Sequence, residues 1–181
     1  MSDAQHLEAL RVRFNAGEEL DFLFFWGHRP GRNGVTASCF SQWYVAPFVV
    51  GGQSYPTAEH FMMAEKAALF GDLAIRDLVL QAPDPGAAKA LGRKVRGFNE
   101  ETWLESRFSI VRRANEAKFS QNAELGRFLV QTGSKVLVEA SPVDRIWGIG
   151  LAKHDEEAND PNLWRGLNLL GFALMQVRDR A

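Results

Sequence analysis

The residue that the sequence best equips for chemistry is Glu59. It follows Thr57 by two positions, and a threonine there is typical of the cap that begins a helix. In the first helical turn the dipole favours an ionised carboxylate by about 0.3–1 kcal/mol. Such a group can activate water, attack an anomeric carbon or stabilise an oxocarbenium-like centre, which are the roles that glycosidic cleavage needs. The same position also fits an acid that only stabilises its own helix.

Lys66 lies seven residues after Glu59, on the same predicted helix face. Its amine could pair with Glu59, bind a phosphate, or form an imine with an opened ribose if its pKa were lowered. A surface lysine near the end of a helix is the simpler alternative.

Tryptophans beside polar or glycine-containing segments form a second group of candidates. An aromatic face next to such a loop can stack on a nucleobase, which is worth roughly 1–3 kcal/mol per base. Core packing is the alternative for each, and it is the role expected of Trp103 inside a long helix. The segments concerned are Trp26-Gly27-His28, Ser41-Gln42-Trp43 and Trp147-Gly148. Trp164 is a fourth candidate tryptophan, outside these segments.

Several familiar sites are absent from the sequence. Gly148 and Gly150 are too few glycines for a dinucleotide-binding fingerprint, and neither a P-loop nor a Gly-x-Ser-x-Gly motif occurs. Cys39 has no neighbouring base. The histidines His28, His60 and His154 lack ligand spacing. We therefore expect no metal and no cofactor.

The overall composition is that of an ordinary globular protein. The 181 residues are 46% hydrophobic and 24% charged, enough for one domain with a sizeable core. A net charge of −1 provides no global field to recruit a polyanion. A single cysteine excludes an internal disulfide, and the sequence has neither a signal peptide nor the roughly 18–20 apolar residues of a membrane span. These features predict a cytoplasmic protein without membrane contact.

The elements that must position these residues indicate an α+β fold, mostly helical with a small β-sheet. We expect strands at Phe22–Phe25 and Val136–Val138, and extended chain over Ser41–Val50 before a turn at Gly51-Gly52. Lys153–Asn162 is predicted to be exposed. The predicted helices are Leu7–Phe14, Ala58–Phe70, Arg76 to about Leu80, Pro85–Arg96, a long helix capped by Asn99, Glu124–Gln131 and Leu167–Arg178.

The order of several motifs resembles the NADAR (YbiA-like) family. That family has an F-S-N-F element followed by a helix of the form [ST]-x-E-H-x-x-x-A-x-K. The counterparts here are Phe40-Ser41-Gln42-Trp43 and Thr57-Ala58-Glu59-His60 through Ala64 to Lys66. Further matches are Leu91-Gly92-Arg93, Arg112-Arg113 to Lys118-Phe119, Leu137-Val138-Glu139, Asp144 with Trp147-Gly148, and Gly166-x-Asn168-x-Leu170-Gly171.

The resemblance implies a single NADAR domain over residues 21–181, preceded by an N-terminal helix or extension over residues 1–20. It also implies hydrolysis of N-glycosidic bonds. One branch of the family acts on early riboflavin-pathway intermediates, and others act on ADP-ribose attached to guanine. The family's catalytic glutamate falls on Glu59, its helix lysine on Lys66 and its W-G tryptophan on Trp147. Gln42 replaces an asparagine of the YbiA branch, and Ile149 replaces an aspartate.

These inferences combine into a hypothesis for the site. Glu59 cleaves the bond between a phosphoribosyl or ADP-ribosyl group and its base, which could be guanine in a nucleic acid, and Lys66 is a second catalytic candidate. Phosphate is held by Arg93, Lys94 and the first-turn amides of the Glu59 helix. The remaining substrate-binding candidates are Trp26, Gly27, His28, Ser41, Gln42, Trp43, Asp144, Trp147, Gly148 and Asn168. The alternatives are a non-catalytic module that binds ADP-ribose or a nucleotide, and a purely structural or interaction protein.

Overall fold

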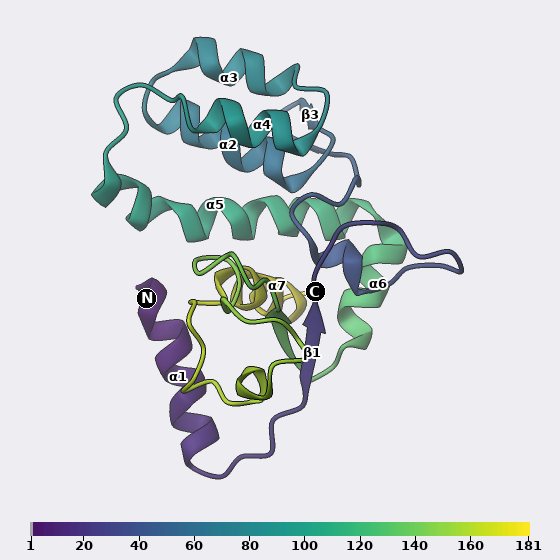
Figure 1. Cartoon of the computed structure of the whole chain (residues 1–181). Coiled ribbons are helices and arrows are strands. Elements are labelled where there is room, and N and C mark those ends of the chain that lie inside the picture. The colour runs from purple at the N-terminus through teal and green to yellow at the C-terminus, as the bar shows by residue number, and fades with distance from the viewer. Residues whose placement is uncertain (1) are drawn as a thin grey trace. The chain divides into compact units, whose positions relative to one another are not determined.

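The computed structural model describes residues 2–181. The chain forms two compact units. Unit 1 combines the chain up to Ser41 with Arg127–Ala181, and unit 2 is the continuous segment Gln42–Gly126. Figure 1 labels the elements of both. Helices outnumber strands in the described chain, so the predicted mostly helical α+β class is confirmed.

In unit 1, two short strands pair in parallel although they lie far apart in the sequence. β1 (Phe22–Phe25) pairs with β4 (Val136–Glu139), with Phe22 opposite Val136. α7 (Leu169–Arg178) packs against β4, and α1 (Asp3–Asn15) packs against α7. The rings of His6 and Phe172 stack with 5.6 Å between their centroids. Both predicted strands are confirmed, and the hydrophobic run of β4, Val136–Val138, is buried.

In unit 2, α2 (Ala58–Leu69) packs against three other helices, as Figure 1 shows. They are α3 (Leu73–Leu80), α4 (Pro85–Gly92) and α5 (Glu100–Gln121). β2 (Phe48–Val50) and β3 (Gln53–Tyr55) form an antiparallel hairpin around Gly51-Gly52, both at positive φ. α6 (Ala123–Gln131) runs from the end of unit 2 into unit 1.

The boundaries of two helices differ from expectation. α3 begins at Leu73 rather than Arg76, because Asp72 Oδ1 accepts from Ile75 N at 3.3 Å and caps it. Asp72 also binds Arg96, which holds the pKa of Asp72 well below its usual value. α4 ends at Gly92, four residues before the predicted Arg96.

The chain before the hairpin is less extended than predicted. Only Phe48–Val50 of the expected Ser41–Val50 segment is a strand, and Ala37–Phe40 forms a short 3₁₀ helix. The turn is followed by a further short strand, β3, which pairs with β2, so residues 2–181 contain two separate two-stranded sheets rather than one.

Two further differences concern the C-terminal part of the chain. The segment predicted to be exposed contains Ala158, which is fully buried because Trp164 packs over it and donates from Nε1 to the Ala158 carbonyl at 2.8 Å. Trp164 is therefore a core residue. α7 begins at Leu169 instead of Leu167, because Asn168 adopts a left-handed conformation with φ 53°. None of the helices within residues 2–181 has the length and apolarity needed to cross a membrane.

Candidate active site

The start of α2 places Glu59 in the interior of the protein. Thr57 caps the helix, since its hydroxyl accepts from His60 N at 3.3 Å. Glu59 N donates to the carbonyl of Gln42 at 3.0 Å, and the Glu59 residue is only 3% exposed. A carboxylate that merely stabilised its helix would sit in solvent. The burial of Glu59 therefore favours the chemical role over the purely helix-stabilising one.

His60 ties the same helical turn to the end of α3. Its Nδ1 lies 2.8 Å from Thr57 Oγ1, and its Nε2 lies 3.1 Å from the carbonyl of Ala82. Because a carbonyl only accepts, Nε2 carries the proton and Nδ1 accepts from the threonine hydroxyl. A neutral imidazole satisfies both bonds, and burial lowers the pKa of His60.

This arrangement predicts a pH dependence of stability. Since the pKa of His60 is lower in the folded chain than the ordinary 6.5, the unfolded chain binds the proton first as the pH falls. The unfolding free energy should therefore be unaffected by this group above about pH 7 and should fall below about pH 6.5, by at most about 1.4 kcal/mol per pH unit. Urea titrations of wild type and His60→Gln between pH 4.5 and 8 would measure the slope.

The variant should flatten the slope below pH 6.5 without abolishing it, because burial also lowers the pKa of His6. His154→Gln removes an exposed imidazole and serves as the control. A slope equal to that of wild type in His60→Gln would contradict the prediction.

The first-turn amides of α2 are engaged within the protein. Glu59 N binds Gln42 O, His60 N binds the Thr57 hydroxyl, and Phe61 N binds Thr57 O at 3.3 Å. The expectation that these three amides hold a phosphate is therefore wrong, since their hydrogen bonds are already used to fix the helix start.

Two buried polar residues of α5 were not predicted as site residues. Asn115 and Lys118 are both 0% exposed. Asn115 Nδ2 donates to Gln42 Oε1 at 2.9 Å, and Lys118 Nζ lies 5.6 Å from the centre of the Tyr44 ring. Their spacing of three places them on one helix face. The signal that could have identified them was an amide and an amine on the same helix face as the apolar residues Val111 and Ala114.

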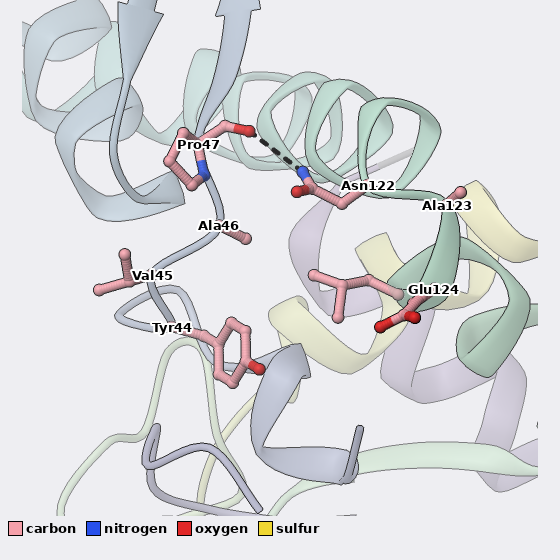
Figure 2. A pocket seen from close by; sticks show the side chains of 8 residues that line it. Tyr44, Val45, Ala46, Pro47, Asn122, Ala123 and Glu124 are labelled. Atoms are coloured by element: carbon pink, nitrogen blue, oxygen red, sulfur yellow. Dashed lines mark hydrogen bonds between the residues drawn. The ribbon is translucent and has the colours of Figure 1, made fainter. Parts of the chain in front are cut away.

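The chain after Gln42 continues along the same part of α5. Asn122 Nδ2 donates to the carbonyl of Pro47 at 3.1 Å. A cavity of about 300 Å³ opens beside this contact, and Figure 2 shows the Tyr44–Pro47 segment opposite Asn122–Glu124. Its lining combines apolar carbon with the Tyr44 ring and the Glu124 carboxylate. The volume is at the lower end of the range for small-molecule sites.

Lys66 is held by its surroundings rather than directed at Glu59. Its Nζ donates to the carbonyl of Gly92 at 2.9 Å and lies 4.7 Å from the Phe98 ring and 5.4 Å from the Trp103 ring. Burial lowers the pKa of Lys66, and the positive charge of Arg93 lowers it further. The amine closes the last turn of α4, and Trp103 is half-buried instead of fully in the core.

The other candidates in unit 2 lie at or near α4. Trp43 is half-buried, with Lys89 Nζ 5.9 Å from its ring centre. Arg93 and Lys94 directly follow α4 and are exposed. The structure therefore leaves both cations available to an anion in solution.

In unit 1, the segment Trp26-Gly27-His28 follows β1 and is exposed, with Trp26 64% accessible. Gly27 has φ 82°, a conformation that favours glycine. Ser41 ends the 3₁₀ helix, with its N donating to Ser38 O at 3.1 Å. An exposed indole beside a glycine turn is compatible with the predicted stacking role, which stays a prediction.

Asp144 orders the loop that carries Trp147. Its Oδ1 accepts from Ile146 N and Trp147 N, both at 2.8 Å. A Cβ at Gly148 would lie 2.8 Å from the carbonyl of Glu139, so only glycine fits this approach. Ile149, where the YbiA branch has an aspartate, is fully buried. The loop is thus rigidly built, and Trp147 remains half-buried.

Asn168 braces β4 against the start of α7. Its Oδ1 accepts from Glu139 N at 3.0 Å and its Nδ2 donates to Leu137 O at 2.9 Å, and the residue is 0% exposed. Both ends of the amide bind the backbone of this unit. Nothing in this geometry requires a substrate.

The structure thus brings Gln42 to Glu59 through a backbone bond, with Trp43 next to Gln42 in the chain, and it groups Lys66 with Arg93. Asp144, Trp147, Gly148 and Asn168 share one loop region of unit 1, connected by the bond from Asn168 N to Gly148 O at 3.1 Å. Within residues 2–181, no three His, Cys, Asp or Glu side chains converge to form a metal site.

Comparison with known proteins gives a consistent result. The family model described as "NADAR domain" matches residues 24–181. A curated N-glycosidase of Acanthamoeba polyphaga mimivirus is 42% identical over 87% of this chain and 95% of its own length. N-glycosidase YbiA of Escherichia coli is 31% identical over 78% of this chain and 79% of its own. The NMR structure of YbiA superposes with a TM-score of 0.71 at 28% identity, covering 90% of this chain and 86% of that one.

Proposed function

The chain belongs to the NADAR family and is an N-glycosidase, and we propose that it hydrolyses the bond between a phosphoribosyl or ADP-ribosyl group and a base. The observation that carries this proposal is the position of Glu59. A carboxylate that is 3% exposed, in the first turn of α2, is shielded from bulk water and stabilised by the helix dipole. Those are the conditions in which it can act on a glycosidic carbon.

In the proposed reaction, Glu59 acts at the anomeric carbon while water replaces the base. The carboxylate serves as a base for the water, as a nucleophile, or as a stabiliser of the positive charge that develops on the sugar. Asp144 is a positioning residue in this scheme, because it fixes the loop of Trp147. Trp43, Trp147 and Trp26 remain the candidates for stacking on the base. Lys66 is proposed to support α4 through Gly92 rather than to react.

The test is a screen for released sugar. The purified chain would be incubated with phosphoribosylamino-pyrimidines, ADP-ribosylated guanosine, ADP-ribosylated guanine in single-stranded DNA, and NAD, and free ribose 5-phosphate or ADP-ribose would be measured by mass spectrometry. We expect release from at least one substrate. Tight binding of ADP-ribose in calorimetry without release from any of the four would instead support a non-catalytic binding module.

The same screen tests metal independence. We expect the rate to stay within about twofold of the untreated enzyme after treatment with EDTA, because a carboxylate and water suffice for the proposed chemistry. A loss of activity that Mg²⁺ or Zn²⁺ restores would contradict this expectation.

Arg93 and Lys94 provide a prediction about phosphate recognition. If these exposed cations hold the phosphate, Arg93→Ala/Lys94→Ala should raise KM for a phosphorylated substrate about tenfold and leave kcat within about twofold, because the phosphate contacts stabilise the bound substrate and the transition state equally. Steady-state kinetics with the phosphorylated substrate and its dephosphorylated form would measure the effect. Lys153→Ala, which removes another exposed cation, is the control. An unchanged KM would remove both residues from the site.

A further inference from the structure

Two buried side-chain amides lie next to each other in unit 2. Asn115 Nδ2 donates to Gln42 Oε1 at 2.9 Å and to the carbonyl of Val111 at 2.9 Å. Both partners of this nitrogen can only accept. The orientation of each amide is therefore determined by the hydrogen-bond network: Asn115 directs its nitrogen toward Gln42, and Gln42 directs its oxygen toward Asn115.

This orientation leaves one donor and one acceptor without a partner. Gln42 Nε2 and Asn115 Oδ1 are buried, and neither has a hydrogen-bond partner in the described part of the chain, residues 2–181. The two residues are 6% and 0% exposed. Buried polar groups are nearly always hydrogen-bonded, so an orphaned pair beside a candidate active site calls for a functional explanation.

A hydroxyl group complements this pair. One hydroxyl can accept from an amide N–H and donate to an amide carbonyl at the same time. The Gln42 and Asn115 amides share a single hydrogen bond, and a hydroxyl linking their other two atoms would close the ring. A carboxylate or phosphate could accept a hydrogen bond from Gln42 Nε2. It would be repelled by Asn115 Oδ1, because the oxygens of the anion and Asn115 Oδ1 are all acceptors. The pair therefore selects a neutral hydroxyl over an anion.

The position of the pair identifies the hydroxyl. The carbonyl of Gln42 binds Glu59 N at 3.0 Å, so the backbone of Gln42 lies next to the helical turn that carries the residue proposed to act at the anomeric carbon. The hydroxyl next to the anomeric carbon of a ribose is the 2-hydroxyl, and hydrogen bonds to that group strengthen in the transition state of glycosidic cleavage. Building on the proposed function, we infer that Gln42 and Asn115 bind the 2-hydroxyl of the substrate ribose and make the enzyme specific for ribosyl over 2-deoxyribosyl compounds.

The experiment compares three sugar phosphates by calorimetry: ribose 5-phosphate, 2-deoxyribose 5-phosphate and arabinose 5-phosphate, whose 2-hydroxyl has the opposite configuration. Wild type should bind ribose 5-phosphate about tenfold or more tightly than either analogue. Gln42→Met and Asn115→Leu should each reduce this preference to about twofold or less by weakening the binding of ribose 5-phosphate alone. Gln121→Met is the matched control, because Gln121 lies on the same helix as Asn115 and its amide binds the backbone of Val49 in β2. This variant should keep the wild-type preference.

Thermal unfolding accompanies the binding measurements. The double variant Gln42→Met/Asn115→Leu removes all four polar atoms, so its melting temperature should be no lower than that of wild type. If the variants fold poorly, the preference of the wild type among the three sugars still tests whether the protein recognises the 2-hydroxyl of ribose.

Absence of that preference, or an equal loss of affinity for all three sugars in the variants, would overturn the inference and leave a structural amide pair. The proposed hydrolysis fails by a different result, namely a wild type that binds ribose 5-phosphate selectively and releases base from no ribosyl substrate.

Discussion

Replacing Glu59 with glutamine should lower the rate of sugar release by about a thousandfold, which corresponds to about 4 kcal/mol of transition-state stabilisation. The amide has nearly the shape of the carboxylate, and the backbone bond from residue 59 to the carbonyl of Gln42 is retained. It cannot act as a base or nucleophile, and it carries no charge to stabilise an oxocarbenium ion. Single-turnover measurements on the substrate found by the screen would separate this chemical defect from weaker binding.

Glu65→Gln is the matched control for this experiment. Glu65 lies on the same helix and forms an ion pair with Arg113 at 3.0 Å, so its loss should change the rate by about twofold or less. Both variants should retain the wild-type circular dichroism spectrum. A Glu59→Gln enzyme with at least a tenth of the wild-type rate would remove Glu59 from the catalytic role.

The second large effect concerns stability and comes from Asn168. Asn168→Ala removes the partners of Glu139 N and Leu137 O, each buried group costing about 1–3 kcal/mol when left unsatisfied. Alanine at φ 53° adds roughly 1–2 kcal/mol of backbone strain. We therefore expect the unfolding free energy to fall by about 3–8 kcal/mol in urea titrations, a large fraction of the stability of an ordinary domain.

Two further variants separate these causes. Asn168→Gly accepts the left-handed conformation but loses the same hydrogen bonds, so it should be more stable than Asn168→Ala by about 1 kcal/mol. Asn162→Ala removes an exposed asparagine that binds Asp160, and it should cost less than about 1 kcal/mol. A loss below about 1 kcal/mol for Asn168→Ala would show that the brace contributes little.

Features that depend on nearby residues could be predicted from the sequence. Thr57, Asp84 and Asn99 each cap a helix by accepting from an amide three positions later, which is a purely local interaction. The apolar runs of β1 and β4 likewise predicted both strands. The order of the NADAR motifs then indicated the family and the chemical class of the reaction.

Features that depend on contacts between residues far apart in the chain could not be predicted from the sequence. The end of α4 is set by Lys66, whose amine binds the carbonyl of Gly92 twenty-six positions away. Asn115 is separated from Gln42 by 73 positions, so no spacing rule connects their amides. Asn168, in its left-handed conformation, accepts a hydrogen bond from the amide of Glu139 in β4, which lies 29 positions earlier. In each case the partner was visible in the sequence but its proximity was not.

The parallel pairing of β1 with β4 has a consequence for biosynthesis. Phe22–Phe25 emerges from the ribosome early, yet its partner Val136–Glu139 is made more than a hundred residues later. Unit 2, by contrast, is one continuous stretch whose contacts form between segments made in succession. We therefore expect unit 2, which carries Glu59, to fold on the ribosome and become resistant to protease first. At that stage β1 is still unpaired, because β4 has not yet been synthesised.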